Sequence, residues 1–483
     1  MAEMENYTIT ELREKLLAKE LSAKEITQYY LDRIKKYDEE LNTYITVCEE
    51  EALRKAEEFD NNFEEGKEKK LAGIPISVKD VFSTKDIPTT CASHILDGYT
   101  PVYNSTVVER ILNEDAIILG KTNLDEFCHG SGTATSYYGP SRNPWDTTKL
   151  PGGSSGGSSA ALAADLCAGT LGTETAGSIR LPASWCGIVG LKPTYGRVSR
   201  YGVLAMGSSL DSPGPLAKSV EDSALLLSII AGYDQYDQTS SRVEVPNYLE
   251  IIKKGNIKDL KIAVPKEYLN MELQEDVRRN FLKSIDILKK LGVTIEEVSL
   301  LDPKFGIAVY TLTCRSEVAS NLARYDGTRY GLEGSNVDTI VDNYNSARGE
   351  GFGQEAKRRV MTGTFSLSAG YADEYFKKSE QVRQLIKEDL DDVFKKYDVI
   401  VGPTTPSVAL TDKDAENPLF GELADVLAEG SSLAGLPGIT IPSGLSNGLP
   451  TGIQFIGRHY DEATILTLAN ALERELGRLT LEL

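Results

Sequence analysis

Long hydrophobic runs are absent from this 483-residue chain, which is 41% hydrophobic and 26% charged. No uninterrupted apolar stretch is long enough to cross a bilayer. The chain starts MAEMENYTITELREKL, which is acidic and amphipathic and contains neither the basic nor the apolar segment of a secretory signal. We therefore expect a globular protein of the cytoplasm that does not associate with membranes.

Cysteine and histidine are also scarce. The six cysteines show no C-x-x-C spacing, which argues against a zinc site and a disulfide framework, so we expect reduced thiols and no bound metal. Of the three histidines, only His94 and His129 lie outside the C-terminal region. Either could complete a Ser-His-Asp triad, but nothing in the sequence connects a histidine to a nucleophile.

Positive charge is in deficit, with 52 Lys and Arg against 72 Asp and Glu and a formal net charge of −20. Phosphate contacts need clustered Lys and Arg. The composition therefore argues against a chain that grips a nucleic acid by itself, and any RNA would be held mainly by a partner.

Glycine and serine, in contrast, are concentrated in residues 151–199. The segment contains PGGSSGGSSAALAA, then GTETAGSIR, then GIVGLKPTYGRVS, and it places Ser154 and Ser178 in separate glycine-rich loops. Such loops let main-chain N–H groups approach a ligand closely, as an oxyanion site requires. A hydrolytic nucleophile fits this pattern.

Two other interpretations of the same segment are a phosphate-binding loop and a flexible linker. The run lacks the Lys-Ser/Thr ending of a P-loop and the spacing of a dinucleotide fingerprint. A linker would not lead directly into the apolar, alanine-rich residues 160–168. Both alternatives are weaker than the catalytic one.

Helical and strand-like periodicities alternate along the chain. Apolar positions on one helical face predict covering helices over about residues 1–65, at 9–17, 23–37 and 46–59. Short β-like segments follow at 74–78, 116–119, 187–191, 261–264, 399–402, 439–441 and 453–456, with helices at 106–113, 220–231, 274–291, 375–396 and 462–475. This alternation predicts an α/β fold with a sheet covered on both faces. No linker is evident, so we expect residues 1–483 to form a single domain, with polar residues 234–258 as a peripheral excursion.

A lysine stands at the end of one of the apolar segments. The sequence LAGIPISVKDVF places Lys79 next to Asp80. Burial disfavours the charged form of a lysine, and a neutral lysine could replace histidine as the general base for a serine. The alternative is an ordinary surface ion pair between these two residues.

Three motifs, GIPISVKD, GGSSGGS and GTETAGSIRLPA, occur in this order. Together they resemble the amidase signature family, serine hydrolases that cleave carbon–nitrogen amide bonds, and the resemblance covers nearly the whole chain. It implies the amidase-signature fold, a large mixed β-sheet covered by helices on both faces, and a Ser-Ser-Lys triad. Ser178 would be the nucleophile, Ser154 the bridging serine held by a cis peptide bond, and Lys79 the base.

The resemblance also implies an oxyanion hole formed by the backbone N–H groups of Thr175, Ala176, Gly177 and Ser178. Ala176 departs from the family pattern, in which glycine is usual, and an alanine fits the loop only if its φ is negative. Other departures are Glu174 where aspartate is common, Ser432 where asparagine is common, and the lack of a glutamate in residues 130–136. These departures leave the triad unchanged.

Further motifs are GKTNLDEF at residues 120–127, RNPWD at 142–146, SNLARYDGTRYG at 320–331 and GEGFGQEAKRRV. They resemble one subfamily, the A subunits of glutamyl-tRNA(Gln) and aspartyl-tRNA(Asn) amidotransferases. In that subfamily the A subunit hydrolyses L-glutamine and supplies ammonia to a B subunit. The B subunit uses ATP to convert Glu-tRNA(Gln) to Gln-tRNA(Gln), or Asp-tRNA(Asn) to Asn-tRNA(Asn), while a small C subunit braces the pair.

The resemblance therefore implies a heterotrimer in which the mischarged tRNA is held mainly by the B subunit. It places no cofactor in this chain, and it assigns ATP and Mg²⁺ to the B subunit. The sequence does not distinguish Glu-tRNA from Asp-tRNA as the acceptor.

A glutamine zwitterion requires a cation for its α-carboxylate and an anion for its α-ammonium. By the resemblance, Arg358 and Asp425 take these roles and Tyr310 faces the substrate. Arg359 follows directly in the sequence AKRR and is the alternative to Arg358.

Two other functions stay open. A stand-alone amidase for small amides would share the triad but would need no recognition pair for a zwitterion. A catalytically inactive scaffold subunit is a third hypothesis, which the presence of Lys79, Ser154 and Ser178 disfavours.

Overall fold

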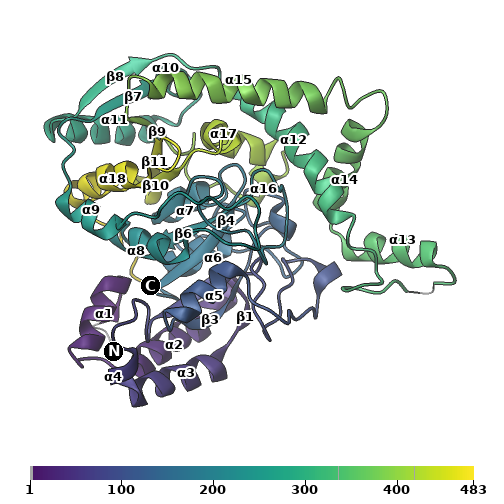
Figure 1. Ribbon diagram of the computed structural model, residues 1–483, viewed down its shortest axis with the longest axis horizontal. Coiled ribbons are helices and arrows are strands. Elements are labelled where there is room, and N and C mark those ends of the chain that lie inside the picture. The colour runs from purple at the N-terminus through teal and green to yellow at the C-terminus, as the bar shows by residue number, and fades with distance from the viewer. Residues whose placement is uncertain (1–3, 336, 418) are drawn as a thin grey trace.

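A computed structural model describes residues 4–335, 337–417 and 419–483. Their strands form one 11-stranded mixed sheet in the order β1-β3-β2-β4-β6-β5-β10-β11-β9-β7-β8 (Figure 1). The α/β prediction is confirmed. The strands are β1 Tyr44–Val47, β2 Pro75–Lys79, β3 Ile117–Thr122, β4 Gly169–Glu174, β5 Val189–Lys192, β6 Ser212–Ala217, β7 Lys261–Pro265, β8 Thr294–Val298, β9 Val399–Pro403, β10 Gly438–Ser446 and β11 Leu449–Gly457.

Helices pack along the sheet and account for most of the remaining regular structure. For example, α6 contacts β2, β3 and β4, whereas α18 contacts β10 and β11. The helices are α1 Ile9–Leu17, α2 Ala23–Leu41, α3 Glu49–Asn61, α4 Phe63–Gly66, α5 Thr106–Asn113, α6 Gly156–Ala163, α7 Arg180–Cys186, α8 Val220–Ile230, α9 Tyr248–Lys254, α10 Lys266–Leu269, α11 Glu275–Lys290, α12 Lys304–Leu322, α13 Ile340–Gly351, α14 Gln354–Leu367, α15 Phe376–Phe394, α16 Asp412–Ala415, α17 Phe420–Leu433 and α18 Glu462–Leu476.

The N-terminal helices form as the sequence predicts. Thr8 caps α1 in a capping box with Glu11, and Ser22 caps α2 in the same way with Glu25. Each helix buries its apolar face in the main core.

The predicted helix at residues 46–59 is partly wrong, because it begins only at Glu49. The preceding residues YITV form β1, which pairs antiparallel with β3. Aromatic and β-branched residues favour a strand. In addition, the buried Tyr44 hydroxyl contacts Ser77 Oγ at 2.6 Å, which ties this edge strand to β2.

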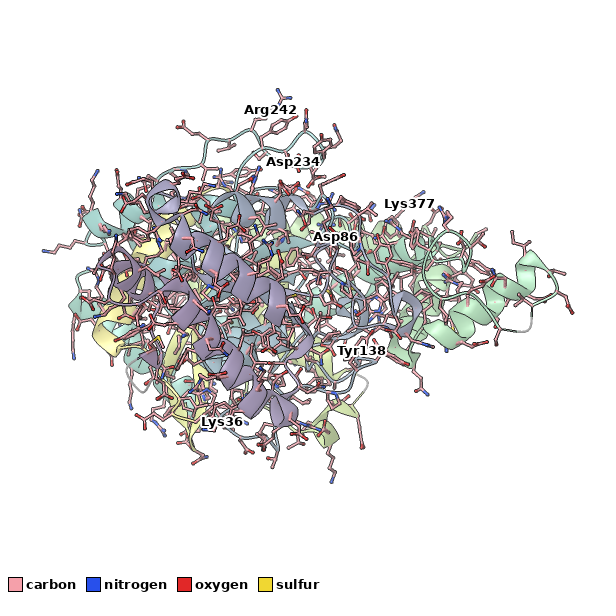
Figure 2. The ribbon with its side chains drawn as sticks, turned by 90° about the horizontal axis from the view of Figure 1, so that it is seen from below. Lys36, Asp86, Tyr138, Asp234, Arg242 and Lys377 are labelled. Carbon is pink, nitrogen blue, oxygen red and sulfur yellow. The ribbon has the colours of Figure 1, made fainter. Side chains whose placement is uncertain are left out.

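Two segments stand away from the body. Figure 1 shows α13 at the right-hand edge, and Figure 2 shows the same helix projecting in the perpendicular view. Figure 2 also places Arg242 on an outlying loop, within the polar excursion predicted for residues 234–258. No helix in the described ranges is both long and apolar enough to span a membrane.

Strand register brings the candidate residues to one edge of the sheet. β2 and β4 are parallel neighbours, with Ile76 opposite Gly169 and Val78 opposite Leu171. The carboxyl ends of parallel strands meet at the same edge, where α/β proteins bind their ligands. Lys79 ends β2 and Glu174 ends β4, so residues 175–178 follow at that edge.

Candidate active site

Lys79 is completely buried, and its ammonium group reaches both the serine loop and β4. Its Nζ lies 2.7 Å from Ser154 Oγ and 3.0 Å from Ser155 Oγ. The same nitrogen lies 3.0 Å from Thr173 Oγ1 on β4. The predicted pair of Lys79 and Ser154 is therefore in direct contact, with two further hydroxyls that fix the amine.

The alternative of a surface ion pair between Lys79 and Asp80 is not what the structure contains. Asp80 is completely buried and pairs with Lys121, at 3.0 Å between Oδ1 and Nζ. Its other carboxylate oxygen accepts hydrogen bonds from Thr90. Lys79 therefore lacks a carboxylate partner at that position and is directed to the serines.

Ser154 follows a cis peptide bond from Gly153, as the family resemblance implies. A Cβ on Gly153 would lie 2.2 Å from a carboxylate oxygen of Asp125, so this position requires glycine. The next residue, Ser155, donates its N–H to the carbonyl of Ser178 at 3.2 Å. This bond ties the loop of the bridging serine to the loop of the predicted nucleophile.

Glu174 closes the loop that carries Ser178. Its Oε2 accepts hydrogen bonds from the N–H groups of Ile179 and Arg180, both at 3.1 Å. Its Oε1 accepts from the Arg180 side chain and from Ser432 Oγ, the latter at 3.0 Å. The two departures at Glu174 and Ser432 are thus in contact with each other and jointly hold the loop.

Residues 175–178 offer the donors of an oxyanion hole. None of their N–H groups donates a hydrogen bond within the described part of the chain. Their carbonyls are held instead: Ser432 Oγ donates to the Ala176 carbonyl at 2.7 Å. Ala176 is not among the residues with positive φ, so its methyl group fits the loop. Ser178 itself is 5% exposed, at the start of α7.

Tyr310 and Asp425 both reach this loop. The Tyr310 hydroxyl lies 2.8 Å from Thr175 Oγ1. Asp425 Oδ1 is so close to Gly177 that a Cβ there would lie 2.0 Å away. Asp425 Oδ2 accepts a hydrogen bond from Ser131 Oγ at 2.7 Å, whereas the buried Oδ1 has no partner among the described residues. Burial raises the pKa of Asp425 to about 8.

The two adjacent arginines differ in where they lie. The Arg358 side chain is 42% exposed and pairs with Glu355. The Arg359 side chain is only 8% exposed and lies near Tyr310, where its charge favours loss of the hydroxyl proton and so works against the effect of burial on the tyrosine pKa. Within the described residues, Arg359 donates a hydrogen bond through Nε alone, to Glu355, which leaves its two terminal nitrogens for a ligand. The structure therefore favours Arg359, the alternative in the sequence, over Arg358.

A pocket of about 670 Å³ opens beside these residues. Its wall combines the loop at residues 129–135, the first turns of α14 and the start of α17. A pocket of this size admits a free amino acid or a larger amide.

Several residues that hold the site were not identified from the sequence. Asp125 accepts hydrogen bonds from the N–H groups of residues 132–135, at 2.8–3.2 Å, and so fixes the pocket loop that carries Ser131. Ser155, Thr173 and Arg180 were missed as well. The one signal available was charge: Arg180 directly follows the nucleophile motif in a segment that is otherwise small or apolar.

Comparison with known proteins gives consistent results. The family model described as Amidase matches residues 25–466. The chain is 50% identical over 472 residues to the A subunit of glutamyl-tRNA(Gln) amidotransferase from Geobacillus sp. (strain WCH70), with 97% of each chain covered. It is 49% identical over 476 residues to the protein of the same name from Enterococcus faecalis, with 98% of this chain and 97% of that protein covered.

Solved structures extend the similarity. The A subunit of glutamyl-tRNA(Gln) amidotransferase from Thermotoga maritima has a TM-score of 0.81 and 38% identity, covering 98% of this chain and 95% of that chain. Native peptide amidase from Stenotrophomonas maltophilia has a TM-score of 0.83 and 28% identity, covering 98% of each chain.

Proposed function

This chain belongs to the amidase family, and we propose that it is the glutaminase subunit of a tRNA-dependent amidotransferase. Near-full-length identity of about half to proteins named as A subunits of glutamyl-tRNA(Gln) amidotransferase supports this assignment. The observation that carries it is the placement of opposite charges, Arg359 and Asp425, around the loop of Ser178. A free α-amino acid has the matching pair of charges next to its side-chain amide.

Catalysis begins at the buried amine. Lys79 in its neutral form accepts a proton from Ser154 Oγ, which in turn accepts the proton of Ser178 Oγ. The activated Ser178 oxygen attacks the carboxamide carbon of glutamine. The N–H groups of residues 175–178 then stabilise the negative charge on the tetrahedral intermediate.

Ammonia leaves when this intermediate collapses. The proton held by Lys79 returns through Ser154 to the departing nitrogen, and a γ-glutamyl ester remains on Ser178. Water, activated by the same two groups, hydrolyses the ester and releases glutamate. One relay thus serves as base and as acid in both halves of the reaction.

Substrate recognition uses charges that exist in the free amino acid. The terminal nitrogens of Arg359 pair with the α-carboxylate, and the unpartnered Oδ1 of Asp425 accepts from the α-ammonium. The Tyr310 hydroxyl lines the same space through its contact with Thr175.

The assembly follows from the names of the relatives. Ammonia released here passes to a B subunit, which binds the mischarged tRNA, ATP and Mg²⁺, and a C subunit completes a cytoplasmic heterotrimer. The net charge of −20 supports placing the tRNA on a partner. No cofactor is assigned to this chain.

Ammonia release from L-glutamine tests the proposal. We expect weak release by the purified chain alone, stimulation by the B and C subunits with ATP and Glu-tRNA(Gln), and loss of release in Ser178→Ala. A panel of simple aliphatic and aryl amides in which glutamine is the poorest substrate would instead identify a stand-alone amidase. Release that survives Ser178→Ala would overturn the nucleophile.

A further inference from the structure

One buried histidine in the pocket wall has no role in the mechanism above. His129 is completely buried, and neither of its ring nitrogens has a hydrogen-bond partner among the described residues. An imidazole is a polar group whose burial without a partner costs free energy. Most buried polar groups are paired, so this one requires an explanation.

The position of His129 is set by the segment that anchors the pocket loop. It follows the short 3-10 helix Glu126–Cys128, and its N–H donates to the Glu126 carbonyl at 2.8 Å. Its side chain lines the 670 Å³ pocket together with Ser131 and Arg359. The unpartnered nitrogens are therefore next to the space in which the substrate binds.

The charges around the ring select the kind of ligand it can bind. Burial and the guanidinium groups of Arg359 and Arg315 lower the pKa of His129 well below its ordinary value. The imidazole is therefore neutral, with one N–H donor and one acceptor nitrogen. Arg315 is already paired with Glu422 at 2.7 Å, whereas Arg359 keeps two free terminal nitrogens. An anion in this part of the pocket is the ligand that suits both groups.

We propose that His129 is a second ligand of the substrate α-carboxylate, donating one hydrogen bond while Arg359 supplies the positive charge. The inference rests on the proposed function, since it takes a carboxylate-bearing amide as the substrate. It assigns His129 to recognition and leaves the chemistry to Lys79, Ser154 and Ser178. Packing alone would not explain why both ring nitrogens lack partners beside an arginine with free donors.

The test compares two substrates that differ only in the α-carboxylate. L-glutamine carries this group, and 4-aminobutanamide is the same molecule without it. In His129→Met the side-chain volume is kept and the polar atoms are lost. We expect the ratio of kcat/KM for glutamine to kcat/KM for 4-aminobutanamide to fall tenfold or more, as for loss of a hydrogen bond to a charged group.

The loss is expected in KM more than in kcat, because the contact is made before and during reaction alike. His129→Gln retains an N–H donor and is expected to restore most of the ratio. His94→Met is the matched control, because His94 stacks on Tyr137 at 4.6 Å and does not line the pocket. Thermal unfolding of each variant verifies folding, and His129→Ala replaces His129→Met if the latter does not fold.

The possible outcomes separate the two proposals. If wild type hydrolyses glutamine and His129→Met leaves the substrate ratio unchanged, His129 is not a carboxylate ligand. An equal loss on both substrates, or no rescue by His129→Gln, also overturns the inference, since either would indicate packing alone. If wild type does not hydrolyse glutamine, the proposed function fails first, and the role of His129 in glutamine binding fails with it.

Discussion

The hydroxyls around Lys79 do not contribute equally to the reaction. Ser154 relays the proton, whereas Ser155 only orients the amine, with its Oγ 3.0 Å from Nζ and its hydroxyl donating to the Thr173 carbonyl. We predict a loss of kcat of about 10³-fold or more in Ser154→Ala. In Ser155→Ala the loss is about tenfold, as for one misplaced hydrogen bond.

Steady-state ammonia release by the two variants, with unfolding curves as the folding check, measures the difference. Equal losses in the two variants would show that Ser154 is not the relay.

The two neighbouring arginines provide a second comparison. Replacing Arg359 by lysine removes the fork that can bind a carboxylate through two parallel hydrogen bonds. We predict that Arg359→Lys raises KM for glutamine at least tenfold. Arg358→Lys, a matched change at the exposed position, should raise it less than twofold. Glutamine titrations of both variants measure this, and the reverse order would restore Arg358 as the ligand.

Asp425 gives the recognition of glutamine a pH dependence. Its pKa is raised to about 8, so at pH 6 the carboxyl is mostly protonated and cannot pair with the α-ammonium. We predict that kcat/KM for glutamine rises with pH until about pH 8. Glutaramate, which is glutamine without its α-amino group, should not show this dependence on Asp425.

Asp425→Asn is the companion variant. It should raise KM for glutamine about 100-fold, as for truncation of a buried charge pair, and flatten the pH profile. If glutamine and glutaramate have the same profile in wild type, Asp425 does not bind the ammonium.

The pocket loop depends on a single carboxylate. Asp125 accepts hydrogen bonds from the N–H groups of residues 132–135, and the loop carries Ser131, the partner of Asp425. Removing the acceptor leaves buried N–H groups unpaired, at about 1–3 kcal/mol each. We predict that Asp125→Ala lowers the free energy of unfolding by about 3 kcal/mol and speeds hydrogen exchange at residues 132–135.

Asp146→Ala is the control, because Asp146 makes only local turn bonds to Thr148 through its side chain. Urea denaturation and exchange measurements decide between them. Unchanged exchange at residues 132–135 in Asp125→Ala would show that the loop is held by other contacts.

Local signals in the sequence predict some of these elements well. Helices α1 and α5 were predicted with the bounds Ile9–Leu17 and Thr106–Asn113 that the structure shows, because each has a capping residue and an apolar face. Four strands, β1, β4, β6 and β8, were not predicted. The sequences of β4 and β6, GTLGTE and SPGPLA, have low strand propensity, and they are strands because neighbours pair with them on both sides.

The candidate site divides in the same way. The motifs located Lys79, Ser154 and Ser178, because the chemistry is concentrated in short glycine-rich loops. The choice between Arg358 and Arg359 could not be made, since successive residues of a helix point in directions about 100° apart and only the packing of α14 decides which one faces Tyr310. Asp125 was missed because its partners are backbone groups, which every sequence contains.

The molecule as a whole carries several carboxyl groups that folding removes from water. Burial raises the pKa of Asp38 and Asp222 to about 6, and that of Asp211 and Glu473 to about 7. Between pH 4 and pH 7 the folded state therefore binds more protons than the unfolded state. The free energy of unfolding must then fall as pH rises through this range.

We predict lower resistance to urea at pH 7 than at pH 5. Lys192, whose pKa burial lowers to about 7, opposes this trend only above pH 7. Glu473→Gln should reduce the slope, and Glu475→Gln, an exposed neighbour on the same helix, is the control. Stability that rises from pH 5 to pH 7 would contradict the assignment of these groups as protonated in the fold.

The central claim is that Ser178 carries the glutamyl group during glutamine hydrolysis, and trapping that ester tests it most directly. The purified chain, mixed with L-glutamine and quenched in acid within one turnover, is digested and its peptides are weighed by mass spectrometry. The account predicts one added glutamyl group on the peptide that contains Ser178, and none in Ser178→Ala. A glutamyl group on another residue, or glutamate formed at the wild-type rate by Ser178→Ala, would contradict it.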